Sequence, residues 1–181
     1  MPARIHILGA SGSGTTTLGR ALAARLACPH LDTDDYFWVP SDPPFEVIRP
    51  LPERCALLGN ALASRPGWVL SGSLCGWGDE FIPLFGLVVL LSLPAEVRMA
   101  RLHTRERARY GAAALGPGGR MHQEHVRFMA WAAGYEDGGL EMRSRRLHDA
   151  WLAKLTCPVL HLSSLAATEE LMGDVIARIP S

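Results

Sequence analysis

Apolar residues along the chain fall into short unbroken runs and longer stretches with helical spacing. The unbroken runs predict five strands, at residues 4–8, 29–32, 68–71, 87–91 and 158–162. The run Leu87–Leu91 is apolar throughout, which is typical of a parallel strand buried on both faces.

The stretches between these runs predict helices. In one of them, Leu51, Cys55, Leu58 and Leu62 recur at helical spacing. The expected helices cover residues 15–26, 51–64, 94 to about 109, about 122–135, 140–155 and 167–179. Strands that alternate with helices predict an α/β fold with a parallel sheet, and residues 1–181 contain no linker that would divide them into two domains.

Two segments depart from this alternation. Residues 33–50 are rich in proline and aromatic residues, which predicts an ordered loop rather than a helix. Residues 111–120, GAAALGPGGR, are rich in glycine and predict a mobile segment. We expect both to be excursions from one core.

Composition limits the function classes. The 18 basic and 18 acidic residues cancel, which argues against a general surface for nucleic acid or acidic membranes. The four cysteines form no C-x-x-C pair, as expected of core residues in a reducing compartment. A strand-like run starts at Ile5 without a leader before it, and no apolar run approaches the length of a membrane span. The sequence therefore predicts a cytoplasmic protein, and it leaves the oligomeric state open.

The stretch GASGSGTTTLGR, residues 9–20, follows the first strand and opens the first helix. Its glycines have the spacing of the phosphate-binding loop G-x-x-x-x-G-K-[ST], in which backbone N–H groups and a helix N-terminus hold phosphate groups. Thr16 stands where the hydroxyl that binds Mg²⁺ belongs, but Thr15 replaces the lysine. The residues expected to bind the nucleotide are Gly9, Ser11, Gly12, Ser13, Gly14, Thr15, Thr16 and Thr17.

An arginine could replace the missing positive charge. Arg98, Arg101, Arg105 and Arg109 lie at i, i+3, i+7 and i+11, on one face of the helix that leads into the glycine-rich segment. We expect Arg101, Arg105 and Arg109 to contact the phosphates, and the alternative is a solvated helix face. Arg120, Arg143 and Arg146 lie further along the chain.

Acidic residues follow the second strand directly, at the sheet edge where ligands of open α/β folds bind. We expect Asp32 to hold Mg²⁺ through water and Asp34 to accept a proton from the acceptor hydroxyl. Asp35 could take either role, and a turn held by Asx hydrogen bonds is the alternative. Ser71-Gly72-Ser73 and Gly76–Asp79 also follow a strand, and they suit either a small-molecule pocket or a tight loop.

Together the Gly9-to-Thr16 loop, the Asp32-x-Asp34 pair, the Ser71-Gly72 strand end and the arginine face resemble the small P-loop kinases. This is the group of nucleoside monophosphate kinases and shikimate kinase, and the resemblance covers nearly the whole chain. It implies a three-layer fold whose five-stranded parallel sheet has the order 2-3-1-4-5. It also implies an acceptor region near residues 33–65 and a lid near 110–120.

The resemblance implies ATP and Mg²⁺ as cofactors and phosphoryl transfer to a small molecule, either a nucleotide or a hydroxylated metabolite. It makes Asp34 the acid on the acceptor side and makes the helix-face arginines phosphate clamps. Thr15 is the departure, and it leaves a nucleotide-binding protein without transfer activity as an alternative. Ser13-Gly14-Thr15-Thr16 also resembles the donor loop of sulfotransferases, but Gly12 stands where those loops carry a basic residue.

Overall fold

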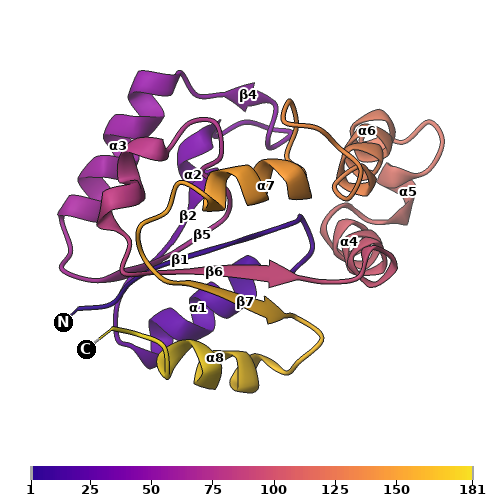
Figure 1. Ribbon diagram of the computed structural model, residues 1–181. Coiled ribbons are helices and arrows are strands. Elements are labelled where there is room, and N and C mark those ends of the chain that lie inside the picture. Colours follow the sequence, from indigo (N-terminus) through magenta and orange to yellow (C-terminus); the bar gives the residue numbers. More distant parts are fainter. Residues whose placement is uncertain (1, 181) are drawn as a thin grey trace.

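A parallel five-stranded sheet forms the centre of the computed structural model, which describes residues 2–180 (Figure 1). Its strands lie in the order β2-β5-β1-β6-β7, which in chain order is 2-3-1-4-5, as predicted. Register places Ile5 beside Val69 on one side and beside Leu87 on the other. The strands are β1 (Arg4–Gly9), β2 (His30–Asp32), β5 (Trp68–Ser71), β6 (Leu87–Ser92) and β7 (Val159–Ser163).

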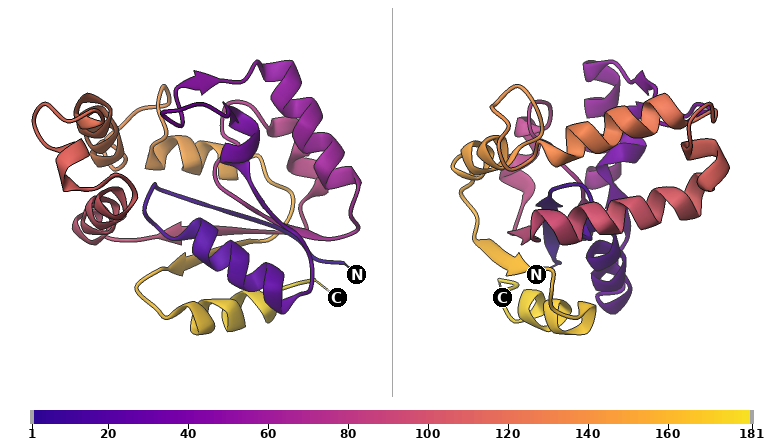
Figure 2. Two further views of the ribbon diagram at one scale, coloured as in Figure 1. Left: turned by 180° about the vertical axis from the view of Figure 1, so that it is seen from behind. Right: turned by 90° about the vertical axis from the view of Figure 1, so that its right-hand side faces the viewer.

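Helices cover both faces of the sheet, which gives three layers (Figures 1 and 2). On one face, α1 (Thr15–Arg25) and α8 (Thr168–Ile176) bury leucines and a valine against β1, β5 and β6. On the other face, α3 (Leu51–Ala63) and α7 (Arg145–Leu152) bury Leu58, Leu62 and Trp151 against the same strands. The sheet is therefore buried on both sides, as the apolar run in β6 predicted.

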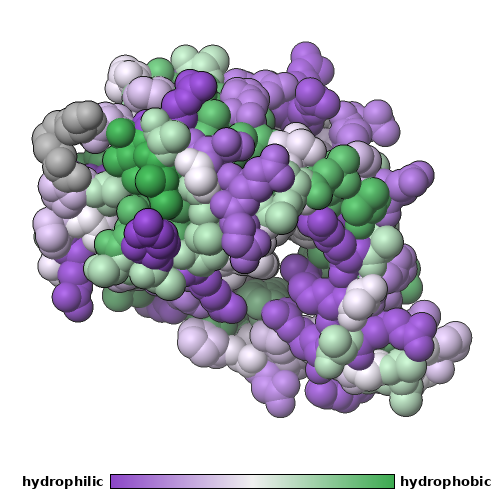
Figure 3. Space-filling view, turned by 90° about the horizontal axis from the view of Figure 1, so that it is seen from below, coloured by the Kyte–Doolittle hydropathy of each residue, from purple (hydrophilic) through white to green (hydrophobic). Residues whose placement is uncertain are grey.

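Three helices project from the sheet as a hairpin, which we call the lid. This name covers more residues than the segment 110–120 in which the sequence predicts a lid, and closure of that segment stays a prediction. The lid consists of α4 (Ala95–Tyr110), α5 (Ala112–Leu115) and α6 (His122–Ala133), and α4 and α6 run along each other (Figure 2). Buried Leu102, Met129 and Ala132 join its two arms. Seen from below, the lid is a lobe at the lower right, with a hollow between it and the body (Figure 3).

The expectation of a loop over residues 33–50 is wrong. This segment contains the helix α2 (Thr33–Phe37) and a two-stranded hairpin of β3 (Trp38–Val39) and β4 (Val47–Ile48). The Asp32 carboxylate caps α2 by accepting a hydrogen bond from the Asp34 N–H. The cap lets a short helix form at the start of the segment. The prolines that suggested a loop all follow this helix.

Two further boundaries differ from the expectation. The glycine-rich segment 111–120 contains the helical turn α5, and Leu115 in that turn is buried. The helix expected at 140–155 begins only at Arg145, because Ser144 caps it by accepting a hydrogen bond from the Leu147 N–H. A short 3₁₀ helix, η1 (Asp79–Leu84), precedes β6. Within residues 2–180, no helix is long and apolar enough to span a membrane.

Candidate active site

The loop between β1 and α1 has the shape of an anion cradle. Gly14 is the N-cap of α1, has a φ of 93°, and provides no side chain to bond the first N–H groups of the helix. A Cβ built on Gly14 would meet no atom within 4 Å, so the space beside this residue is open. A helix N-terminus with open space in front of it attracts anions through its free N–H groups and its dipole.

The same loop rests on the lid. A Cβ on Gly12 would lie 2.9 Å from Leu102 Cγ and 3.0 Å from the Arg98 carbonyl oxygen, both in α4. The hydroxyl of Ser13 is buried and has no hydrogen-bond partner within residues 2–180. The cradle is thus built from β1, α1 and α4.

The side chains predicted to hold Mg²⁺ meet at the ends of the strands. Thr16 Oγ1 donates a hydrogen bond to Asp32 Oδ2 at 2.9 Å, and Ser71 Oγ donates to the same oxygen at 3.1 Å. The other oxygen, Oδ1, accepts the Asp34 N–H at 3.1 Å. A hydroxyl beside a fixed carboxylate is a suitable donor set for Mg²⁺, which prefers oxygen ligands. The residues present therefore fit the ion that the sequence implied.

Two arginines, one in α4 and one in the loop before α7, influence the Asp34 carboxyl. Burial raises the pKa of its carboxyl, and the positive charges of Arg143 and Arg105 oppose that rise. A carboxylate whose pKa is raised is a better proton acceptor than one in water. Asp35, the alternative to Asp34, is exposed.

Arg98 and Arg101, in the first half of the arginine face, are engaged within the fold. Arg98 is fully buried and donates to the Ala132 carbonyl at 2.8 Å and to Glu136 at 2.7 Å. Arg101 donates to the Ser164 carbonyl at 3.1 Å. The regular spacing therefore does not give four equivalent arginines, and Arg101 as a phosphate clamp stays a prediction.

Arg105 and Arg109, in the second half, are freer. Arg105 is 47% exposed, and its ion pair with Glu106 is 3.3 Å long. Arg109 lies 5.5 Å from the ring centroid of Phe45, so it joins the lid to the β3–β4 hairpin. Arg105 also lies 5.6 Å from the ring centroid of Phe128, and its charge is close enough to affect Asp34.

Arg54 in α3 was not among the site residues predicted from the sequence, but its environment makes it a candidate. Its guanidinium lies 4.4 Å from the ring centroid of Phe37 and 5.2 Å from that of Trp77, and its Nε and Nη1 atoms are buried without a partner within residues 2–180. Such donors cost stability unless something binds them. The available signal was the position of Arg54 among Leu51, Cys55 and Leu58, the apolar positions of its helix.

Side chains of the loop after β5 bond to other parts of the fold. Both oxygens of Asp79 are occupied, one by Trp151 Nε1 at 2.8 Å and the other by Lys154 Nζ at 2.7 Å. Ser73 lies 3.5 Å from His148, whose other ring nitrogen is 2.9 Å from the Tyr135 hydroxyl. Asp79 therefore ties η1 to α7, which disfavours it as a proton acceptor.

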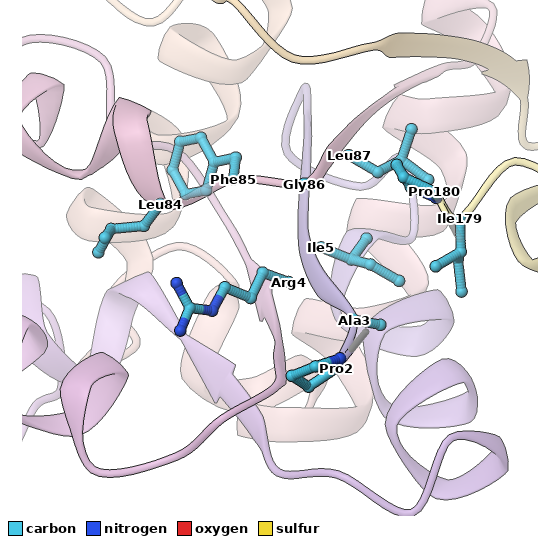
Figure 4. Close-up of a pocket in the computed structure, with 10 residues that line it drawn as sticks. All are labelled: Pro2, Ala3, Arg4, Ile5, Leu84, Phe85, Gly86, Leu87, Ile179 and Pro180. Carbon is cyan, nitrogen blue, oxygen red and sulfur yellow. The ribbon is translucent and has the colours of Figure 1, made fainter.

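A cavity of about 320 Å³ lies elsewhere, beside the first residues of β1 (Figure 4). Arg4, Phe85 and Ile179 are among the residues that line it, and none of the predicted site residues does. The strands run away from this cavity toward the phosphate loop, so it belongs to the opposite edge of the sheet. The candidate active site lies at the other edge, where Thr16, Asp32 and Ser71 meet beside the N-terminus of α1.

Comparison with known proteins agrees with this geometry. No protein-family model matches the chain. Shikimate kinase from Acinetobacter baumannii, solved with shikimate, superposes with a TM-score of 0.56 at 17% identity, over 97% of this chain and 92% of that one. A gluconokinase from Sinorhizobium meliloti 1021 superposes with a TM-score of 0.55 at 19% identity, over 97% of this chain and 90% of that one. These likenesses show the fold of the small P-loop kinases.

A relative by sequence covers the whole chain. The uncharacterized protein YqaC of Bacillus subtilis (strain 168) is 44% identical over 181 residues, which are 100% of this chain and 99% of that protein. An identity this high over the full length of both proteins shows common descent. The chain belongs to the family of Bacillus subtilis YqaC, and it has the fold of the small P-loop kinases.

Proposed function

We propose that this protein transfers a phosphoryl group from ATP to a hydroxyl group of a small molecule. The observation that carries the proposal is the convergence of the Thr16 and Ser71 hydroxyls on Asp32 Oδ2, at 2.9 and 3.1 Å, beside an uncapped helix N-terminus. A phosphate cradle, oxygen ligands for a metal and a second acid beyond them are the parts that phosphoryl transfer needs.

In this proposal the backbone of residues 9–17 binds the phosphates, and Thr16 and Asp32 hold Mg²⁺. When bound, Mg²⁺ neutralises negative charge on the phosphate oxygens. Asp34 accepts the proton of the acceptor hydroxyl, and the raised pKa of its carboxyl supports that role. The cations around the phosphates are Arg105 and the other predicted clamps Arg101 and Arg109, and Arg143 approaches from the side of α7.

Arg54 suggests the chemistry of the acceptor. A guanidinium that lies over two aromatic rings and has two unpaired buried nitrogens suits a carboxylate or phosphate group. We therefore propose an acceptor with both a hydroxyl and an anionic group. Shikimate, which is bound in one structural neighbour, combines these groups, and so do gluconate and a nucleoside monophosphate.

A screen tests this function. ADP release from ATP is measured with hydroxy acids and nucleoside monophosphates, each compared with an uncharged analogue, and ³¹P NMR identifies the product. We expect an anionic acceptor to be phosphorylated, and Arg54→Leu to raise its KM at least tenfold while the KM for ATP is unchanged. The exposed Arg65, which follows the C-cap of α3, provides the control Arg65→Leu. Equal use of acids and neutral analogues would contradict the proposed role of Arg54.

A second function is favoured by one feature, the threonine at position 15. A binding protein without transfer activity would bind ATP yet release no ADP with any acceptor in the panel. Tight ATP binding together with a completely negative screen would therefore favour that function over the kinase.

A further inference from the structure

We propose that His30 is a positioning residue for Asp32 and acts through the hydroxyl of Ser71. This inference rests on the proposed metal site. His30 Nε2 lies 2.9 Å from Ser71 Oγ, which in turn lies 3.1 Å from Asp32 Oδ2. The three residues come from β2 and β5, which are paired so that Asp32 stands beside Ser71.

The direction of each hydrogen bond follows from the chemistry of the groups. A carboxylate only accepts, so Ser71 must use its single hydroxyl proton on Asp32. Toward His30, the Ser71 oxygen can then only accept. His30 must therefore carry a proton on Nε2, and in a neutral ring Nδ1 carries none.

The Asp32 carboxylate also orients Thr16. Its hydroxyl donates to the Asp32 oxygen that Ser71 contacts, so the lone pairs of Thr16 Oγ1 are left free for a cation. Three hydrogen bonds hold the Asp32 carboxylate, and they come from α1, α2 and β5. Without a donor at His30, the Ser71 hydroxyl is free to rotate and one of the three bonds is no longer enforced.

A glycine in α1 makes room for this arrangement. A Cβ on Gly19 would lie 2.8 Å from His30 Nε2 and 3.3 Å from Ser71 Cβ. Glycine is a poor residue for a helix interior, and Gly19 is buried in the middle of α1. The close approach of the His30 ring gives a physical reason for its presence.

The first experiment needs no nucleotide. Long-range ¹H–¹⁵N NMR of the imidazole nitrogens reports which nitrogen of His30 is protonated. We expect the proton on Nε2 in the wild-type protein, and a changed Nε2 shift in Ser71→Ala, where the partner is missing. A proton on Nδ1 alone would overturn the proposal.

The second experiment measures the Mg²⁺ dependence of ATP binding by calorimetry. Residues that orient a metal ligand typically change metal affinity 10–100-fold. We expect His30→Leu, Ser71→Ala and Gly19→Ala to reduce the gain in ATP affinity from Mg²⁺ about tenfold or more. Affinity for ATP without Mg²⁺ should stay unchanged, which also shows that the variants are folded. His30→Gln, which retains an N–H donor, should restore most of the gain.

The outcomes separate this inference from the proposed function. If the wild-type protein and His30→Leu gain equally from Mg²⁺, His30 does not position Asp32, although the metal site stands. If the wild-type protein binds no ATP, the proposed function fails and the metal role of His30 fails with it, whichever ring nitrogen carries the proton.

Discussion

His6 makes the stability of this protein sensitive to acid. The ring is fully buried in β1, stacks on Phe85 with centroids 5.0 Å apart, and meets Trp151 edge-on. Nδ1 lies 3.1 Å from the Leu70 carbonyl oxygen, and Nε2 is buried without a partner within residues 2–180. Burial lowers the pKa of His6 to about 4, and the hydrogen bond to Leu70 offsets only part of that effect.

The sign of the effect follows from proton binding in the two states. Between pH 6.5 and about 4, the unfolded chain protonates this histidine and the folded protein does not, so the free energy of unfolding falls as the pH falls. The full pKa difference corresponds to about 3 kcal/mol, with a maximum slope of about 1.4 kcal/mol per pH unit. Burial also lowers the pKa of His148, to about 3, and this residue acts in the same direction.

Urea unfolding followed by circular dichroism at pH 7, 6 and 5, at constant ionic strength, measures the slope. His6→Phe keeps an aromatic ring on Phe85 but removes the titrating group, so between pH 6 and 5 we expect it to lose about 1 kcal/mol less than the wild-type protein. The comparison uses the change in the free energy of unfolding with pH and not its absolute value, because His6→Phe also loses the hydrogen bond to Leu70. His161→Phe, at an exposed position of β7, is the control. Equal slopes for the wild-type protein and His6→Phe would refute the reasoning.

Three further variants test the division of roles in the site. Thr15→Lys should change ATP affinity less than threefold, because Arg105 already supplies a cation; calorimetry showing a gain of tenfold or more, about 1.4 kcal/mol, would mean that no substitute cation exists. Asp34→Asn should lower kcat for the identified acceptor at least 100-fold with little change in ATP affinity, and full turnover would exclude Asp34 as the proton acceptor. Arg105→Ala should lower turnover and weaken ATP binding together, more than Arg101→Ala does, since Arg101 is held by Ser164; the reverse order in the same assays would exchange their roles.

The sheet was predictable from local pattern, because continuous apolar runs and a glycine loop determine the strand–loop–helix unit. The placement of Thr16 and Asp32 at one edge of the sheet followed too, since parallel strands end at one edge, but their direct hydrogen bond was not predicted. The burial of Arg98 did not follow, because its partner Glu136 lies 38 residues away and helical spacing contains no information about it. The helix α2 was missed because its signal is one capping carboxylate, Asp32, which composition obscures.

The central claim is that the loop at residues 9–17 binds a nucleotide. Calorimetry with ATP and Mg²⁺ on matched glycine variants tests this claim directly. Gly14 and Gly76 have similar φ angles, 93° and 81°, and a Cβ on either would meet no atom within 4 Å. Valine therefore strains both backbones in a similar way, but only at position 14 does it enter the cradle. We expect the wild-type protein and Gly76→Val to bind ATP, and Gly14→Val to lose ATP affinity at least 100-fold. Undetectable binding by the wild-type protein at millimolar ATP, or equal binding by Gly14→Val, would contradict the claim.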